Sequence, residues 1–316
     1  MRHVSVVVPV YNSEASLDAL IERLAAVIAA EGWKADAILV NDGSRDGSWQ
    51  IIQRLNRRYP WIRGINLMRN YGQHNALLCG IRAARYEFIA TIDDDLQHPP
   101  EELPRLFSEL DRGFDVVYGT PLHERHGLLR DLASQFTKLA LQNAMGAQTA
   151  RKVSALRVFR TQLREGFATY QGSFVSIDVM LTWSTTRFSS LAVRHDVRQH
   201  GSSNYTVFKL ITHALNMMTG FSVLPLQLAS IVGFAMTVFG GGVFGYVLVR
   251  YFTGHRVPGF SFLASLISIF SGTQMFAIGI MGEYLARIHF RTLERPTYAV
   301  REETVSALLV GAGKVS

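Results

Sequence analysis

The stretch "YEFIATIDDDLQHPP", residues 86–100, places three consecutive aspartates directly after a run of apolar residues. The apolar part is typical of a buried strand. Each carboxylate of Asp93, Asp94 and Asp95 raises the cost of ionising its neighbours unless a positive charge lies close by. Two interpretations are open at this point: a solvated turn, or a site for a divalent cation.

Strands and helices are expected to alternate before and after this stretch. The expected strands are "HVSVVVPV" (3–10), "ADAILVND" (35–42), "RGINLM" (63–68), "YEFIATID" (86–93) and "DVVYGT" (115–120). The expected helices lie within residues 11–30, 48–59, 74–84 and 99–113, and Asn12 or Ser13 can cap the first. This alternation predicts an α/β fold with a doubly wound, mostly parallel sheet.

Polar clusters follow three of these strands: "YNSE", "NDGSRDGS" and "DDDLQ". Because ligands bind at the carboxyl ends of strands in open parallel sheets, these clusters are expected to meet in one site. Asp42 can accept a hydrogen bond from a base or ribose. The alternative at Asp42 is an Asp-Gly turn followed by a helix cap at Asp46 or Ser48.

The acidic triplet has the composition of a hard cation site. Alternation along a strand would bring Asp93 and Asp95 together and turn Asp94 elsewhere. With the neutral oxygen of Gln97 they form an oxygen-only ligand set, which suits Mg²⁺ or Mn²⁺ and not zinc. His98 is expected to be a turn residue or to support the ligands rather than to bind the metal.

Two arginine clusters are candidates for phosphate binding, because the guanidinium fork matches phosphate geometry. Taken singly, an arginine is more often a surface charge than a phosphate ligand. The clusters contain Arg125, Arg130 and Ser134 in "HERHGLLRDLAS", and Arg198 and Ser203 in "VRQHGSSNY".

The apolar residues concentrate near the end of the chain. Residues 222–249 and 257–282 contain no Asp, Glu, Lys or Arg, and each run is long enough to span a bilayer. We expect a hairpin of two transmembrane helices; two buried core helices are the alternative. Residues 201–222 are amphipathic and are expected to form an interfacial helix or an ordinary surface helix. The arginines after the second run favour both termini on the cytoplasmic side.

The overall composition narrows the partner and the compartment. The net charge is +7, which suggests an anionic partner such as a phosphorylated substrate or a membrane surface. No basic strip with interleaved aromatic residues is present, so nucleic acid is not expected. The single cysteine, Cys79, fits a reducing compartment, and no signal peptide opens the sequence.

These motifs, in this order, resemble glycosyltransferase family 2. "VVVPVYNSEASL", "NDGSRDGS" and "DDDLQHPPEELPRL" are similar to its nucleotide-sugar-binding domain of GT-A type. "RNYGQHNALLCG", "VRQHGSSNY" and the helical hairpin resemble the polyprenyl-phosphate glycosyltransferases, the dolichol-phosphate mannose synthase-like branch, in its bacterial form with two membrane helices. "NYGQH" resembles the aminoarabinose transferases of lipid A modification, with glucosyl transferases of O-antigen modification as close rivals.

The resemblance implies roles for individual residues. Asp42, Asp93 and Asp94 would bind the nucleotide-sugar, together with Pro9, Tyr11 and Glu14. Asp93, Asp95 and Gln97 would hold the metal and the diphosphate. The catalytic set would comprise Asp93, Asp95, Arg125, Arg130, Ser134 and Arg198, and the lipid phosphate would contact Arg125, Arg130, Ser134, Arg198 and Ser203. The family's usual pair of aspartates is Asn41-Asp42 here.

The resemblance implies inverting transfer of a sugar from a UDP-sugar to undecaprenyl or another polyprenyl phosphate, for cell-envelope glycan, lipid A or O-antigen modification. It implies a tetramer in the bacterial inner membrane, with Mg²⁺ or Mn²⁺ as cofactor. The expected domains are a catalytic domain (1–200), an interfacial helix (201–222), two membrane helices (223–252 and 259–286, within 223–288) and a cytoplasmic tail (289–316). The alternatives are a processive polysaccharide synthase, for which the "QxxRW" motif is missing, and an inactive membrane-anchored sugar-binding protein.

Overall fold

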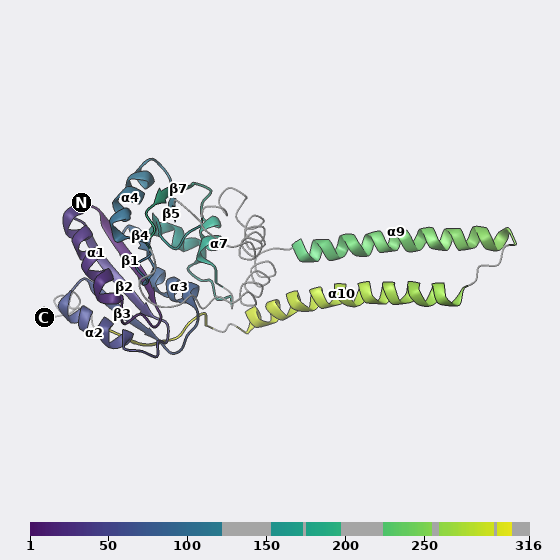
Figure 1. Cartoon of the computed structure of the whole chain (residues 1–316), viewed down its shortest axis with the longest axis horizontal. Coiled ribbons are helices and arrows are strands. Elements are labelled where there is room, and N and C mark those ends of the chain that lie inside the picture. Colours follow the sequence, from purple (N-terminus) through teal and green to yellow (C-terminus); the bar gives the residue numbers. More distant parts are fainter. Residues whose placement is uncertain (122–152, 173–174, 197–223, 255–258, 294–295, 305–316) are drawn as a thin grey trace.

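The computed structural model describes residues 1–121, 153–172, 175–196, 224–254, 259–293 and 296–304. These residues form an α/β domain, from which a pair of long helices projects to one side (Figure 1). The interfacial helix that we expected at residues 201–222 lies outside the described residues.

The expected elements of the first 121 residues all form, with boundaries shifted by a few residues. They are β1 (His3–Val10), α1 (Leu17–Glu31), β2 (Lys34–Asn41), α2 (Ser48–Arg58), β3 (Ile62–Leu67), α3 (Gln73–Ala83), β4 (Phe88–Thr91), the 3₁₀ turn η1 (Pro100–Glu102), α4 (Leu103–Asp111) and β5 (Val116–Pro121). The expected cap of α1 at Asn12 or Ser13 is wrong: the helix starts after Ser16, and the Ser13 hydroxyl donates a hydrogen bond to Asp94 instead.

The remaining elements of the domain were not predicted from the sequence. They are β6 (Arg157–Arg160), the 3₁₀ helix η2 (Thr161–Phe167), α7 (Ile177–Thr182), β7 (Phe188–Val193) and β8 (Val300–Glu303). β6, β7 and β8 are short, and β6 and β8 carry charged residues, so none of them shows the apolar run that marks β1 or β2.

The eight strands form one mixed sheet in the order β7-β5-β6-β4-β1-β2-β3-β8. β4, β1, β2 and β3 are parallel neighbours, and β5 pairs in parallel with β7. β6 lies antiparallel between β4 and β5, and β8 closes the other edge antiparallel to β3. The mostly parallel α/β fold predicted from the sequence is therefore confirmed, with two antiparallel strands added.

Helices cover both faces of this sheet, which explains the continuous apolar runs of its central strands. In β1, Val6 and Val8 pack into the core beneath α1 and α4, while Val7 packs into the second core beneath α3. The contact with α3 is close, since a Cβ on Gly80 would lie 2.3 Å from Val7 Cγ1. This packing fixes the carboxyl ends of β1, β2 and β4 next to one another.

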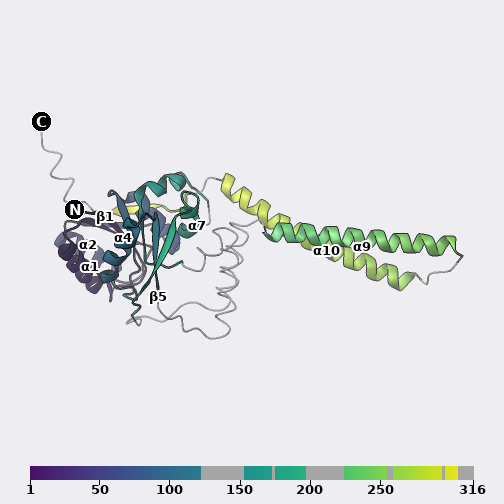
Figure 2. The same ribbon diagram turned by 90° about the horizontal axis from the view of Figure 1, so that it is seen from above.

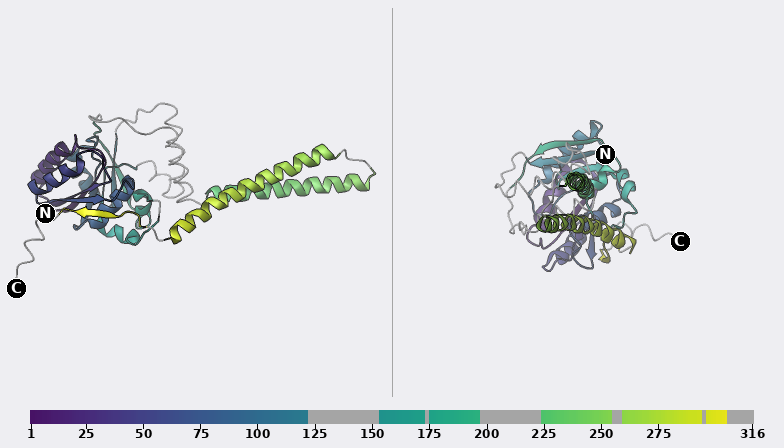
Figure 3. Two further views of the ribbon diagram at one scale, coloured as in Figure 1. Left: turned by 90° about the horizontal axis from the view of Figure 1, so that it is seen from below. Right: turned by 90° about the vertical axis from the view of Figure 1, so that its right-hand side faces the viewer.

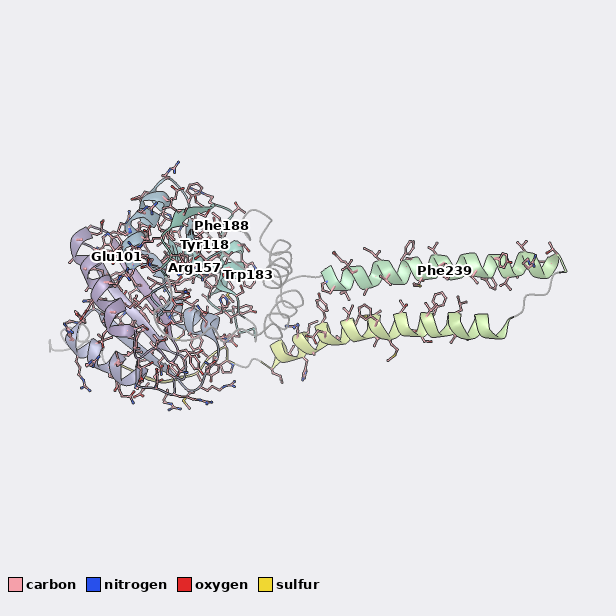
Figure 4. The ribbon with its side chains drawn as sticks, in the orientation of Figure 1. Glu101, Tyr118, Arg157, Trp183, Phe188 and Phe239 are labelled. Carbon is pink, nitrogen blue, oxygen red and sulfur yellow. The ribbon has the colours of Figure 1, made fainter. Side chains whose placement is uncertain are left out.

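The projecting pair consists of α9 (Leu224–Phe252) and α10 (Phe260–Thr292), which contact each other along the hairpin (Figures 1 and 2). Within the described residues, one segment, Pro225–Arg250, has the length and apolar composition needed to cross a membrane. Its large apolar side chains are exposed in this structure; Phe239, for example, is 55% exposed (Figure 4).

The chain returns from the hairpin to the α/β domain. We assigned residues 289–316 to a tail, but α10 continues to Thr292 and residues 300–303 form β8 on the edge of the sheet. Figure 3 shows this strand in yellow on the domain, far from the tip of the hairpin.

Candidate active site

A cavity of about 230 Å³ lies at the carboxyl ends of β1, β2 and β4. Six of its lining residues are ones that the sequence placed in the site: Pro9, Tyr11, Asp42, Asp93, Asp94 and Asp95. Four further lining residues were not singled out in that way: Val10, Asn70, Gly72 and Gln73. The polar clusters that follow the three strands therefore do converge on one place.

The acidic triplet forms a turn rather than the end of a strand. β4 ends at Thr91, and the backbone of Leu96 adopts the left-handed conformation (φ 63°) as the turn closes. All three carboxyl-bearing residues line the same cavity. The expectation that Asp94 would point elsewhere is thus wrong, because the alternation of a strand does not continue past Thr91.

Asp94 joins the acidic turn to the loop that follows β1. Its Oδ2 accepts a hydrogen bond from the backbone N–H of Tyr11 at 3.1 Å and another from the hydroxyl of Ser13. Tyr11 is 43% exposed and lines the cavity, so part of its surface is open to solvent there. The hydrogen bonds from Ser13 and Tyr11 to Asp94 therefore fix one wall of the site.

The carboxyls of the turn hold protons more tightly than free carboxyls do. Burial, together with the nearby charges of Asp95 and Asp94, raises the pKa of Asp93 to about 7. Burial raises the pKa of Asp94 to about 6, although the hydrogen bonds from Ser13 and Tyr11 oppose this. The site therefore favours neutralisation of its negative charge, by protons or by a cation.

Asp42 fixes a second wall, the site loop (residues 68–73). Its two carboxylate oxygens accept the backbone N–H groups of Tyr71 at 2.7 Å and Gly72 at 2.8 Å. Burial raises the pKa of Asp42, and these two hydrogen bonds oppose the shift. From the next residue along, the Nε2 of Gln73 donates to Asp93 Oδ1 at 2.7 Å. The site loop is therefore hydrogen-bonded both to Asp42 and to Asp93 in the acidic turn.

Gly43 allows the site loop to approach Asp42 so closely. Its φ of +66° lies in the left-handed region, and a Cβ there would lie 2.5 Å from the backbone nitrogen of Asn70. The glycine in "NDGS" therefore serves close backbone approach, not the phosphate cradle of a nucleotide-hydrolase loop.

Glu14 lies away from the cavity lining defined by the described residues. Its Oε2 accepts the backbone N–H of Gly47 at 2.7 Å, at the start of α2. Asp46 also accepts the N–H of Ser48 at 3.1 Å, but the residue that precedes α2 is Gly47, so the expected helix cap at Asp46 or Ser48 is wrong. Glu14 and Asp46 thus hold the loops after β1 and β2 together.

Gln97 follows the acidic turn but is likewise absent from the described cavity lining. Its backbone N–H donates to Asp95 Oδ1 at 3.1 Å, and its carbonyl accepts the N–H of Asp196. His98 is buried against His195, and burial lowers the pKa of His98 to about 4, which leaves its ring neutral. The five residues predicted to bind the lipid phosphate lie outside the described residues: Arg125, Arg130, Ser134, Arg198 and Ser203.

A second group of charges, in the domain interior, was missed by sequence reasoning. Arg157 on β6 forms an ion pair with Asp178 on α7, and the Tyr118 hydroxyl donates to the same carboxylate at 3.1 Å. All three residues are at least 95% buried (Figure 4 labels Arg157 and Tyr118). Because these residues are far apart in the sequence, no local pattern indicates that they meet.

The sequence of the domain identifies its family. Residues 5–167, just over half of the 316 residues, match the family model of glycosyl transferase family 2. The chain belongs to glycosyl transferase family 2. The matched range contains Asp42 and the acidic turn, so this glycosyltransferase carries its cavity within the family's shared region.

Curated relatives extend this similarity along nearly the whole glycosyltransferase. The chain is 33% identical over 314 residues to the undecaprenyl-phosphate 4-deoxy-4-formamido-L-arabinose transferase of Shewanella sediminis, covering 98% of this chain and 95% of the relative. It is also 33% identical over 306 residues to the enzyme of the same name from Yersinia enterocolitica, covering 96% and 94%.

Solved structures support the fold of this family 2 glycosyltransferase. Glucosyl-3-phosphoglycerate synthase of Mycobacterium tuberculosis, in a complex with Mn²⁺ and UDP, superposes with a TM-score of 0.51 at 19% identity. The match covers 69% of this chain and 78% of that protein. At this identity the likeness concerns the arrangement of the sheet and helices alone.

The acidic turn of this glycosyltransferase fits a divalent cation on chemical grounds. Its donors are hard carboxylate oxygens, and burial together with the charges of Asp95 and Asp94 raises the pKa of Asp93, so a cation beside it would be favoured. Within the described chain, no three His, Cys, Asp or Glu side chains are grouped as a complete ligand set. Mg²⁺ and Mn²⁺ are commonly held by one or two carboxylates, with water and substrate phosphates in the other positions.

Proposed function

We propose that this glycosyltransferase transfers a sugar from a UDP-sugar to undecaprenyl phosphate, giving a lipid-phosphate-linked sugar. The observation that carries the proposal is the cavity at the carboxyl edge of the sheet, lined by Asp42 and by the three aspartates of the acidic turn. The names of the curated relatives support the acceptor and suggest 4-deoxy-4-formamido-L-arabinose as the first sugar to test.

The two walls of the cavity suggest how the donor lies. The wall formed by Pro9, Tyr11 and Asp42 suits the nucleoside, since a tyrosine ring offers a stacking surface for a base. The acidic turn suits the diphosphate, with Asp93 and Asp95 as metal ligands and Gln97 beside them. A bound Mg²⁺ or Mn²⁺ would neutralise the leaving diphosphate there.

The reaction on this arrangement is a single displacement with inversion. An oxygen of the acceptor phosphate forms a bond to the anomeric carbon, while the bond from that carbon to the diphosphate breaks. Because the acceptor phosphate is already ionised at neutral pH, no strong general base is needed. Bringing two anions together is the harder task, which we assign to Arg125, Arg130 and Arg198 with Ser134 and Ser203.

The hairpin gives the enzyme access to a lipid acceptor. A polyprenyl acceptor stays in the bilayer, so its enzyme has to be held at the membrane. The exposed apolar side chains of α9 and α10 suit insertion into that bilayer. We therefore propose a multi-pass protein of the bacterial inner membrane, with an interfacial helix at residues 201–222, the catalytic domain and both termini in the cytoplasm, and assembly as a homotetramer. Its product would serve lipid A, O-antigen or other envelope glycan modification.

Turnover by the full-length protein tests the proposal directly. The assay supplies undecaprenyl phosphate, Mn²⁺ or Mg²⁺, and in turn UDP-4-deoxy-4-formamido-L-arabinose, UDP-glucose, UDP-N-acetylglucosamine and GDP-mannose. The expected result is release of the nucleoside diphosphate that requires both lipid and metal, with one UDP-sugar clearly preferred. Release without lipid, or from none of the donors while UDP still binds, would overturn the proposed reaction.

A further inference from the structure

The chain segment that follows the hairpin packs on the catalytic domain beside the active site. We call residues 296–304 the return segment. It is anchored on α3, where the Arg82 guanidinium lies 5.7 Å from the Tyr298 ring centroid, and it ends on β3, where Thr304 exchanges two hydrogen bonds with Gly64. Between these points it forms β8, the edge strand of the sheet.

The return segment holds the start of the site loop by its backbone. The N–H of Met68 donates to the Ala299 carbonyl at 2.9 Å, and the Met68 carbonyl accepts a hydrogen bond from Arg301 Nη2 at 3.0 Å. The site loop continues from Met68 to Gly72, whose N–H is bound by Asp42. One end of the loop is thus fixed by the return segment, and the other end by Asp42 and Asp93.

A ladder of side chains connects the same segment to the end of β2. Glu302 Oε1 accepts Asn66 Nδ2 at 3.0 Å, and Asn66 Oδ1 accepts Asn41 Nδ2 at 2.8 Å. Asn41 and Asn66 are buried, and Asn41 immediately precedes Asp42. The ladder therefore crosses three strands, from the exposed edge of the sheet to the wall of the cavity.

The carboxylate of Glu302 sets the direction of this ladder. A carboxylate only accepts hydrogen bonds, so Asn66 must turn its amide nitrogen towards Glu302 and its oxygen towards Asn41. Asn41 then donates, and its own Oδ1 stays buried without a hydrogen-bond donor among the described residues. An apolar residue at position 302 would leave the orientation of both buried amides unspecified.

We infer that the return segment positions the site loop, with Arg301 and Glu302 as positioning residues for the active site. The return segment, which follows α10, therefore supports the loop that lines the proposed donor site. The hairpin and the cavity are connected through this segment. The inference rests on the proposed function only in taking the cavity as the donor site.

Hydrogen exchange of the full-length protein, without ligands, tests the inference independently of turnover. The test variant is Arg301→Met combined with Glu302→Leu, which removes both side-chain contacts at the exposed strand. We expect exchange in a peptide covering residues 68–75 to rise roughly fivefold, as expected for the loss of a typical hydrogen bond. Exchange across α4 (Leu103–Asp111) should stay at the wild-type rate.

The matched control is Glu302→Gln, which keeps an acceptor oxygen for Asn66 and should leave exchange in residues 68–75 near the wild-type rate. The single variant Arg301→Met covers the case in which the double variant does not fold. With an active donor, the double variant should raise KM for the donor severalfold more than it lowers kcat. The inference would be overturned by unchanged exchange in the site loop of the double variant or by an equal rise across α4. It would also be overturned if residues 68–75 exchanged as fast in Glu302→Gln as in the double variant.

Discussion

Two groups of charged residues have different surroundings: the acidic turn, which follows β4, and the buried pair of Arg157 on the neighbouring strand β6 with Asp178 on α7. Asp178 has a guanidinium and a hydroxyl as partners, so its charge is compensated within the fold. Asp93 and Asp94 form no ion pair within the described residues, and the pKa of each is raised. Burial also raises the pKa of Tyr118, whose hydroxyl therefore stays protonated beside Asp178.

The difference separates a group that supports the fold from one that awaits a ligand. A buried ion pair with its hydrogen bonds satisfied belongs to the architecture, and removing one partner leaves an isolated buried charge. Acidic residues gathered around a cavity weaken the fold unless their charge is neutralised, which is the role we propose for a divalent cation. The same chemical group, a buried carboxylate, therefore has opposite consequences for stability and for activity at the two places.

The largest expected effect is on turnover. Asp95→Asn removes a ligand charge from the acidic turn and should lower the rate of nucleoside diphosphate release by about a hundredfold to a thousandfold. The thermal unfolding midpoint should not fall, because the substitution reduces repulsion within the turn. Turnover close to that of the wild type would remove Asp95 from the metal site.

The matched change in the other group should affect stability. Asp178→Asn leaves Arg157 buried without its counter-charge and should lower the free energy of unfolding by about 3 kcal/mol. Denaturant unfolding measures this. Tyr118→Phe is the control, since it removes one hydroxyl and should cost only about 1 kcal/mol. If Asp178→Asn were as stable as the wild type, the division between the two groups would fail.

The pH dependence of stability provides a third test. Asp93 and Asp94 bind protons more tightly in the folded protein, because the pKa rises from the ordinary 3.8 to about 7 for Asp93 and to about 6 for Asp94. Between pH 4 and pH 7 the folded metal-free protein therefore holds more protons than the unfolded chain, and their contribution to stability falls as pH rises. Relative to an Asp93→Asn/Asp94→Asn variant, the wild type should lose on the order of 1–2 kcal/mol between pH 6 and pH 7. If the free energy of unfolding changed with pH in the same way in the wild type and in the variant, the prediction would be wrong.

The smallest expected effect is on metal affinity. Protons and metal compete for the same carboxylates, so Mn²⁺ should bind about tenfold more weakly at pH 5.5 than at pH 7.5. Titration with Mn²⁺, followed by the enhancement of water proton relaxation, measures the affinity without turnover. Asp178→Asn, if it folds, should show the same pH dependence, and an affinity that does not change with pH would argue against Asp93 as a ligand.

Sequence reasoning located the elements and residues whose signal is local. β1 and β2 are buried on both faces and read as continuous apolar runs, and the acidic triplet follows β4 directly in the chain. It misjudged Asp94 because the point at which β4 ends, Thr91, depends on its pairing with neighbouring strands rather than on composition.

What sequence reasoning missed depends on contacts between distant residues. β6, "RVFR", has an arginine at its start that is buried only because Asp178 lies beside it. β8, "VREE", is a strand only because the edge of β3 is available to it. Gln73 could have been suspected from "RNYGQH", but its bond to Asp93 follows from the fold of the site loop.

The antiparallel strand β8 also fixes an order of events during synthesis. Its segment meets β3 across 240 residues of chain, from Gly64 to Thr304, so α9 and α10 are translated before the edge of β3 can be covered. Until then the nascent catalytic domain carries an open strand edge, the feature that pairs most readily with other chains. Any delay between the synthesis of α10 and the pairing of β8 with β3 thus lengthens the interval in which the newly made domain is prone to aggregate.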